Sequence, residues 1–512
     1  MERGAERLMR VKNMIRNSSV SFLSQVLLII AGFFSQRVLF LQAGRELAGL
    51  NSVISNILAI LSVSELGIST AVVFHLYQAL VRKKESEIAA LMNLYRRAYV
   101  VFAIVITVFG LLVLPFVHVF LRHNSFSLYE IRVIYSMWLL RTVLSYLLSY
   151  KRSILIADQR EYIVTIVTTT AGVLNYLLII VIVGLTSAYI PALFANIVIE
   201  AVSNAGLSYY IGRRYPFLKK LRKEPLPFHM ICQIFGDLKN IFFMRIASRL
   251  LTCTDNLIIS GLIDVGTAGV YSNYSLITQS VTNIVIALSN AVQPGIGVLF
   301  VEKNQEKNNQ ALRLLTFSFY FIAVTGAAGL NALMEPFITD LWLNEQSMPL
   351  RSAIVWCAVN CLIQTIGLPL TICMNVSGLF DKERRISMTG AFVNLAVSLG
   401  LARTFGITGV LAGTGCSYFV QLVLRTRCFF HDYLKRSCRS YLLELAEYAC
   451  LAWAVIQAAG VIVDVVYGTG GFLRFLAAGI CCVLFSVGTN LVFFCRSQRA
   501  AALYRIVRRR KY

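Results

Sequence analysis

Long apolar runs recur at near-constant spacing along the chain, with short polar segments between them. Fourteen of these runs are long enough to cross the apolar core of a bilayer, roughly 30 Å thick, as helices. Hydrophobic residues make up 57% of the chain and charged residues only 14%, which is too apolar for a soluble protein. We therefore expect an all-α polytopic membrane protein with about 14 transmembrane helices. The expected spans are 18–41, 48–80, 98–120, 128–150, 162–184, 188–211, 241–263, 268–300, 312–334, 351–376, 386–403, 407–427, 441–464 and 472–495.

Basic residues distinguish the two sides of the predicted membrane region. Of the 48 lysines and arginines, 38 lie in alternate connecting segments, whereas the opposite segments contain five. Because basic residues stay on the cytoplasmic side during insertion, this distribution predicts that both termini are cytoplasmic. It also accounts for the net charge of +23 without nucleic-acid binding, and the basic tail Arg505–Lys511 is expected to contact membrane lipids through their anionic headgroups.

The sequence lacks the common motifs of metal and nucleotide chemistry. Most of the 12 cysteines lie in apolar runs, where a cysteine packs as a small hydrophobic residue. Cys357 and Cys361 share a helix face, but no nearby cysteine or histidine completes a tetrahedral zinc site. Neither an HExxH spacing nor a Walker-type glycine loop occurs. The sequence therefore predicts no metal site, no cofactor and no ATP hydrolysis.

A short internal repeat relates the second and eighth spans. Ala48-Gly49-Leu50-Asn51-Ser52 aligns with Ala268-Gly269-Val270-Tyr271-Ser272, 220 residues later. Six spans is an even number, so both copies enter the membrane from the same side and form a parallel pseudo-repeat of two six-helix lobes. We predict an N-terminal lobe at 1–211, a basic cytoplasmic linker at 212–240, a C-terminal lobe at 241–427, and two further spans with a basic tail at 428–512.

Polar side chains follow one face of each of these two repeated spans. They are Asn51, Ser55 and Ser62 on the second span and Ser275, Gln279 and Gln293 on the eighth. One interpretation is hydrogen bonding between packed helices, which is common in membrane bundles. The other is that both stripes line a water-filled cavity between the lobes.

Charged side chains inside predicted spans are the main candidates for function, because their transfer into lipid is unfavourable. They are Arg37, Arg141, Arg245, Arg249, Glu65, Glu200 and Asp255. Arg245 and Arg249 are four residues apart, so their guanidinium groups share a helix face and could bind a diphosphate. The alternatives are an ion-pair network with Glu65 or Asp255 and, for Arg37, Arg141 and Glu200, extension to the membrane interface.

Three motifs, together with the fourteen spans, resemble the lipid-linked oligosaccharide flippases (Wzx-like) of bacterial polysaccharide biosynthesis. These proteins belong to the multidrug/oligosaccharidyl-lipid/polysaccharide (MOP) exporter superfamily. The motifs are Ser64-Glu65-Leu66-Gly67-Ile68-Ser69, Thr254-Asp255-Asn256-Leu257-Ile258-Ile259-Ser260 and Gly269-Val270-Tyr271-Ser272-Asn273-Tyr274. The resemblance implies a MATE-like fold, with two lobes around a cavity that opens alternately to each side. The lipid II flippases are similar to this chain in their fourteen spans.

The resemblance also implies a function and a location. It implies outward movement of an undecaprenyl-diphosphate-linked oligosaccharide across the bacterial cytoplasmic membrane, without bond-making chemistry and with other polysaccharide-assembly proteins as partners. Flippases of this kind use cationic cavity residues for the diphosphate. Arg37, Arg245 and Arg249 are the positions here that could serve similarly, and Arg141 is a further candidate from its charge and depth. Coupling to a proton or sodium ion would involve Glu65 or Asp255, while Glu200 could couple an ion or balance charge.

Two other functions remain open at this stage. The first is a multidrug or toxin cation antiporter of the same superfamily, although the arginines of the seventh span disfavour a cationic substrate. The second is a membrane glycan polymerase or ligase, for which the short external segment with Glu335, Asp340 and Glu345 would have to supply acid–base catalysis. A solvated rim is the preferred interpretation of these three carboxylates.

Overall fold

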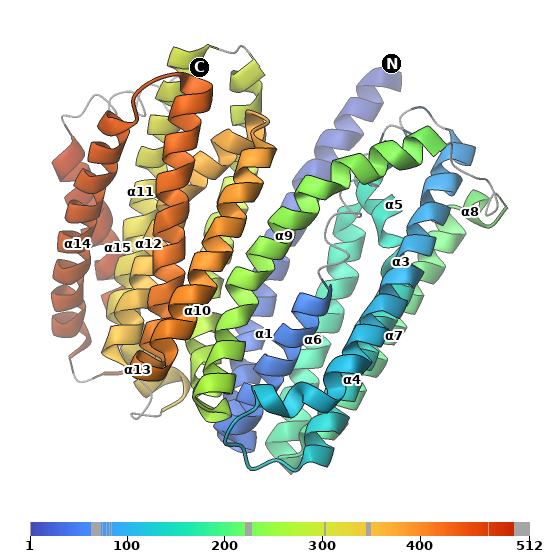
Figure 1. Ribbon diagram of the computed structural model, residues 1–512, viewed down its shortest axis with the longest axis horizontal. Coiled ribbons are helices and arrows are strands. Elements are labelled where there is room, and N and C mark those ends of the chain that lie inside the picture. Colours follow the sequence, from blue (N-terminus) through green and yellow to red (C-terminus); the bar gives the residue numbers. More distant parts are fainter. Residues whose placement is uncertain are drawn as a thin grey trace. The chain divides into compact units, whose positions relative to one another are not determined.

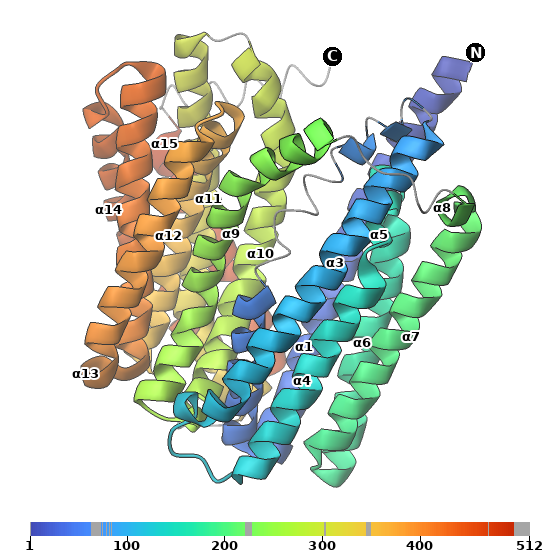
Figure 2. The same cartoon turned by 45° about the vertical axis from the view of Figure 1, so that its right-hand side comes forward.

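The chain folds into long helices in the computed structural model (Figures 1 and 2), and no strand occurs among the residues that the structure describes. Those residues are 2–62, 73, 75–77, 79–80, 82, 84–220, 228–301, 304–344, 350–468 and 470–495. They form two compact units, Met1–Gly269 and Val270–Tyr512, which are described separately below. Helix α10, Val265–Val301, begins in the first unit and continues in the second.

The first unit is a bundle in which α1 is the central element. Its elements are α1 (Glu2–Leu61), α3 (Glu85–Val113), the short 3₁₀ segment η2 (Leu114–Phe120), α4 (Leu128–Ser149), α5 (Arg152–Ala157), α6 (Glu161–Thr186), α7 (Tyr189–Arg214), α8 (Phe217–Lys220) and α9 (Phe228–Leu262). Helix α1 packs against α6, α9 and α4, while α3, α4 and α7 lie side by side (Figure 2). Helix α9, which the sequence repeat assigns to the C-terminal lobe, is thus part of this unit.

The second unit is arranged in layers around α11 and α12. Its elements are α11 (Gln305–Pro336), the π-helical turn η3 (Phe337–Trp342), α12 (Arg351–Val376), α13 (Phe380–Cys428), the π-helical turn η4 (Phe429–Leu434), α14 (Arg439–Tyr467) and α15 (Phe472–Phe494). Helix α12 packs between α11 and α13, and α14 and α15 pack against each other and against α11. Asn304 begins α11 by accepting hydrogen bonds from the backbone N–H groups of Glu306 and Lys307.

Two glycines explain why the helices are longer than the predicted spans. Helix α1 continues through Gly44 and α13 through Gly406, and both glycines have positive φ values, +87° and +58°, which L side chains rarely adopt. Each position falls between two predicted spans, so a predicted loop is here a sharp kink within one continuous helix. The kinked helices α1 and α13 therefore each contain residues of two spans.

The described helices form a protein that crosses the membrane several times. Eleven of them are long and apolar enough to span a bilayer. The two kinked helices each accommodate two predicted spans, and α9 corresponds to the polar seventh span, so fourteen transmembrane helices are compatible with this fold. Large apolar side chains such as Leu473, Leu484 and Val492 on α15 are more than half exposed, as expected for helices that face lipid.

Glycines of the internal repeat meet where α10 begins. A Cβ on Gly49 would overlap the backbone carbonyl oxygen of Val265 and lie 2.9 Å from the backbone nitrogen of Gly269. A Cβ on Gly269 would in turn overlap the carbonyl oxygen of Arg45. The equivalent glycines of the two repeats therefore form one close backbone contact, which only residues without a side chain permit.

Candidate functional site

Arg141 and Glu200 form an ion pair between α4 and α7 in the first unit. The Arg141 Nε donates a hydrogen bond of 2.5 Å to the Glu200 Oε2, and each side chain is 25% exposed. The Arg141 guanidinium also lies 4.8 Å from the centre of the Trp138 ring, within range of a cation–π interaction. Glu200 thus balances the charge of Arg141 in this structure.

The polar residues of α1 form hydrogen bonds within the helix and to its neighbours. The Tyr189 hydroxyl of α7 donates to the Asn51 Oδ1 at 2.5 Å, and Tyr189 is 5% exposed. The Ser55 hydroxyl donates to the backbone oxygen of Ser52 in the preceding turn. Ser62 accepts through its backbone oxygen from the Tyr146 hydroxyl at 3.1 Å. Asn51 therefore takes part in a helix–helix contact, while Ser55 and Ser62 remain only half-buried.

Helix α9 presents two arginines at its surface. Arg245 and Arg249 are both exposed and are one helical turn apart. Within the described part of the chain, neither forms an ion pair with a carboxylate. Asp255, six residues after Arg249, is 3% exposed and lies on a different face of α9. The two guanidinium groups are thus accessible, and Asp255, the acidic residue of α9 whose side chain is described, is buried.

Two further charged candidates are Arg37 and Glu65. Arg37 is half-buried on α1 and has at least one polar interaction. Glu65, with the motif around it, lies outside the described residues. The predicted roles of both residues therefore stay predictions.

The three candidate polar residues of α10, Ser275, Gln279 and Gln293, remain accessible. The Gln279 Nε2 donates to the Ser275 Oγ at 2.6 Å, and Gln279 is exposed. Gln293 is half-buried, directly before Pro294. These side chains lie on one long helix, as the sequence predicted, and none is buried.

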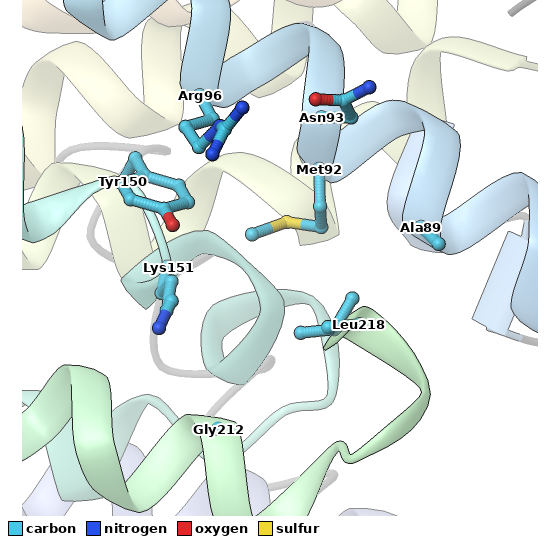
Figure 3. Close-up of a pocket in the computed structure, with 8 residues that line it drawn as sticks. All are labelled: Ala89, Met92, Asn93, Arg96, Tyr150, Lys151, Gly212 and Leu218. Carbon is cyan, nitrogen blue, oxygen red and sulfur yellow. The ribbon is translucent and has the colours of Figure 1, made fainter. Parts of the chain in front are cut away.

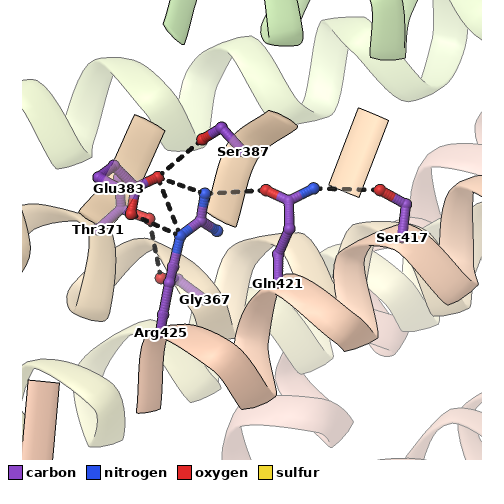
Figure 4. Close-up of polar contacts among 7 residues, drawn as sticks. All are labelled: Gly367, Thr371, Glu383, Ser387, Ser417, Gln421 and Arg425. Atoms are coloured by element: carbon purple, nitrogen blue, oxygen red, sulfur yellow. Dashed lines mark hydrogen bonds and ion pairs between the residues drawn. The ribbon is translucent and has the colours of Figure 1, made fainter. Parts of the chain in front are cut away.

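A buried charged network in the second unit was not predicted from the sequence (Figure 4). Arg425 binds Glu383 through two nitrogens, with Nη2–Oε1 and Nε–Oε2 distances of 2.6 and 3.0 Å. Gln421 accepts from Arg425 at 2.9 Å and donates to Ser417, while Ser387 donates to Glu383. The Glu383 and Arg425 side chains are only 2% and 14% exposed. Glu383 lies in a predicted connecting segment and Arg425 near the end of the predicted span 407–427, and only proximity in the fold reveals that the two are paired and buried.

A sequence signal for part of this network does exist. Ser417, Gln421 and Arg425 recur every four residues and so occupy one face of α13. A second pair of the same kind joins Arg313 on α11 to Glu444 on α14 at 2.5 Å, and the Tyr448 hydroxyl also donates to Glu444. These networks satisfy their own charges, so they are suited to holding helices together rather than to binding a charged ligand.

Comparison with known proteins finds relatives by structure alone. No protein-family model and no curated protein sequence matches the chain. An inward-facing multidrug resistance MATE family transporter of the MOP superfamily matches with a TM-score of 0.62 and 15% identity, over 80% of this chain and 95% of that one. The lipid II flippase MurJ, in an inward closed conformation, matches with a TM-score of 0.61 and 14% identity, over 94% and 99%. A MOP superfamily transporter from Pyrococcus furiosus matches with a TM-score of 0.57 and 15% identity, over 84% and 97%.

The chain has the fold of MOP superfamily transporters. This MOP fold confirms the predicted all-α architecture. At 14–15% identity the matches show a shared fold and carry no residue equivalences.

The flippase and the multidrug transporter match different shares of this chain. The match to the flippase covers 94% of this chain. The residues outside the match are therefore fewer than the residues from Arg439 to the C-terminus. The match must thus extend into α14 or α15, the helices that follow the two predicted six-helix lobes. The match to the multidrug transporter, over 80% of the chain, requires no such extension.

Proposed function

We propose that this protein is a flippase that moves an undecaprenyl-diphosphate-linked oligosaccharide from the cytoplasmic to the external leaflet for surface polysaccharide biosynthesis. It works by alternating access and makes or breaks no covalent bond. Support comes from the MOP fold, which is shared with transporters and with a flippase of a lipid-linked substrate. The proposed location is the bacterial cytoplasmic membrane, with both termini in the cytoplasm.

We base this proposal mainly on the exposure of Arg245 and Arg249 on α9. One turn of helix separates the two Cα atoms by about 6 Å along the axis, so both side chains can reach one diphosphate. A guanidinium group donates two parallel hydrogen bonds to phosphate oxygens and stays charged at any physiological pH. Neither arginine is neutralised by a described carboxylate, so both are available for an anionic ligand.

The other candidates take supporting roles in the proposed mechanism. Arg37 is a further diphosphate-binding candidate, whereas Arg141 would have to exchange its partner Glu200 for the substrate. Ser55, Ser62, Ser275, Gln279 and Gln293 supply hydrogen-bonding groups for the sugar. Asp255 or Glu65 would couple a proton or sodium ion to the conformational change.

The cation antiporter is the nearest alternative, and the MOP fold supports it equally. A cationic drug would need an exposed acidic or aromatic site. Among the charged candidates whose side chains are described, the acidic ones are buried, as Asp255 is, or paired, as Glu200 is, whereas the two arginines of α9 are exposed. The charge that is accessible on these helices thus favours an anionic substrate.

The polymerase or ligase alternative is less well supported. Asp340, one of the carboxylates of the external segment, accepts a hydrogen bond of 2.5 Å from the Tyr467 hydroxyl, which links η3 to the end of α14. Glu335 lies at the end of α11, and Glu345 lies outside the described residues. The similar solved structures named above are transporters and a flippase.

Binding and transport by arginine variants test the proposal. Purified protein is reconstituted in liposomes with a fluorescent undecaprenyl-diphosphate oligosaccharide, and its appearance in the opposite leaflet is measured. Loss of one charged hydrogen-bonding group removes about 2 kcal/mol of binding, so Arg245→Gln and Arg249→Gln should each weaken binding by roughly thirtyfold and slow transport. Lysine at either position should restore part of the activity, because charge is kept and bidentate geometry is lost.

Arg403→Gln is the matched control. Arg403 is also an exposed helical arginine, but it lies on α13 at the predicted external end. The control should retain wild-type binding and transport. Equal activity of Arg245→Gln, Arg249→Gln and Arg403→Gln would contradict the assignment of the α9 arginines to the substrate.

A further inference from the structure

A cavity of about 430 Å³ lies within the first unit, at the end that the charge distribution assigns to the cytoplasm (Figure 3). Its lining residues come from four places along the chain: Ala89, Met92, Asn93 and Arg96 on α3, Tyr150 and Lys151 after α4, Gly212 on α7, and Leu218 on α8. The α3 residues occupy positions i, i+3, i+4 and i+7 and therefore form one face of that helix. None of these residues belongs to the transport site proposed above.

The charge of the lining is unbalanced. Arg96 and Lys151 contribute two positive charges, and no acidic residue is among the described side chains that line the cavity. The Lys151 Nζ donates to the backbone oxygen of Ser208 on α7 at 3.3 Å, which holds the ammonium group at this wall. Two cations at a partly enclosed cavity favour an anionic occupant, because the low local dielectric strengthens their attraction.

Two neutral polar residues, Tyr150 and Asn93, also line the cavity. Tyr150 carries a hydroxyl that is neutral at physiological pH and can donate to an oxyanion. Asn93 is 9% exposed, and its Oδ1 accepts no hydrogen bond from the described residues. That oxygen is covered by neighbouring protein atoms, so Tyr150 is the one of these two residues whose polar group can reach a ligand.

One part of the lining is apolar. Figure 3 shows Met92 pointing into the middle of the cavity and Leu218 of α8 pointing toward it from the opposite side. This pair would pack against carbon atoms of the occupant, such as a glycerol or sugar backbone. An inorganic anion alone would leave the apolar part without a partner.

We propose that this cavity binds the phosphate group of an organic phosphate, with Arg96 and Lys151 as its cationic ligands and with Met92 and Leu218 against its carbon atoms. Two sources share this chemistry: the headgroup of an anionic phospholipid such as phosphatidylglycerol, and a soluble polyol phosphate such as glycerol 3-phosphate. Basic pockets between helices on the cytoplasmic side of membrane proteins are suited to anionic headgroups. This binding is independent of the transported substrate and can be measured without transport.

The test uses the full chain in neutral detergent, with binding measured by native mass spectrometry and by calorimetry. The probes are phosphatidylglycerol, phosphatidylcholine as a neutral lipid, and glycerol 3-phosphate. Wild-type protein should retain phosphatidylglycerol or glycerol 3-phosphate in preference to phosphatidylcholine. The double variant R96Q/K151Q should bind the preferred anion at least about tenfold more weakly, because two charged contacts are lost.

Arg97→Gln is the matched control, since Arg97 is the exposed neighbour of Arg96 on α3 and is not among the lining residues. It should bind as wild type does. Leu218→Glu provides a second test in case the double variant does not fold. It keeps both cations but adds a carboxylate to the cavity, and it should also weaken binding of the anion.

The outcome also identifies the source. Competition of glycerol 3-phosphate with the lipid supports the site and points to a soluble ligand, whereas binding of the lipid alone supports it and points to a headgroup. Equal affinities of wild type, R97Q and R96Q/K151Q, or an L218E variant that binds as wild type does, would overturn the proposal. Failure of both anionic probes to bind wild-type protein would overturn it as well.

Discussion

Arg141 and Glu200 illustrate how a charged residue is accommodated inside the apolar first unit. They lie on different helices and 59 residues apart, yet their side chains form a 2.5 Å ion pair that is only one quarter exposed. A half-buried charge without its partner is unfavourable, because the protein interior solvates it poorly. The pair therefore contributes to the contact between α4 and α7.

Removal of one partner should destabilise the protein more than removal of both. Glu200→Gln leaves Arg141 without a countercharge, and we expect a loss of about 1–3 kcal/mol in the free energy of unfolding, intermediate between exposed and fully buried pairs. The double variant R141Q/E200Q should recover part of this loss. Thermal unfolding in detergent checks both values, and a double variant less stable than E200Q would contradict the account.

At this scale the sequence identifies residues but not their partners. The unfavourable position of a charge within an apolar run identified Arg141 and Glu200 as candidates. Their pairing depends on which helices pack together, which no local pattern encodes. Glu383 and Arg425 were missed for the opposite reason, since each lies next to a polar segment and its burial arises only when the two arms of α13 pack together.

Glycine determines how the long helices pack. At Gly49 and Gly269 the backbones of α1 and α10 approach so closely that a methyl group on either residue would overlap a carbonyl oxygen. Within α13, a Cβ on Gly413 would overlap the Ser398 Oγ of the other arm. Small residues thus allow both contacts, in the manner of helix pairs in membranes.

The substitution Gly49→Ala should disturb the contact between α1 and α10. The added methyl group meets backbone atoms that cannot move aside as a flexible side chain would, so we expect a destabilisation of about 1–3 kcal/mol. Gly206→Ala on α7 is the matched control, since nothing lies within 4 Å of its added Cβ, and alanine is favoured over glycine in a helix. Thermal unfolding distinguishes them, and a G49A variant as stable as G206A would be inconsistent with this contact.

The helices were largely predictable, whereas their connections were not. Apolar runs of sufficient length determine where helices form in lipid, because the backbone must satisfy its own hydrogen bonds there. Hydropathy does not report the backbone path at Gly44 or Gly406, where predicted loops are kinks within α1 and α13. The seventh span was recognised despite its arginines, and it corresponds to part of α9.

At the scale of the whole molecule, the architecture follows from repetition and length. The predicted repeat placed Gly49 and Gly269 at equivalent positions, and the structure brings these two residues into contact. The MOP fold is shared with a multidrug transporter and with a lipid II flippase at about the same TM-score, so the fold alone does not select the substrate. We propose that the accessible positive charges on α9 select an anionic substrate.

Substrate selectivity of the wild-type protein is the most direct measurement of the central claim. Liposomes that contain the purified protein are offered a fluorescent undecaprenyl-diphosphate oligosaccharide and, in parallel, a fluorescent organic cation, with protein-free liposomes as the reference. We predict transfer of the diphosphate-linked sugar between leaflets and no transport of the cation above the reference. Transport of the cation without movement of the lipid-linked sugar would contradict the account and identify an antiporter instead.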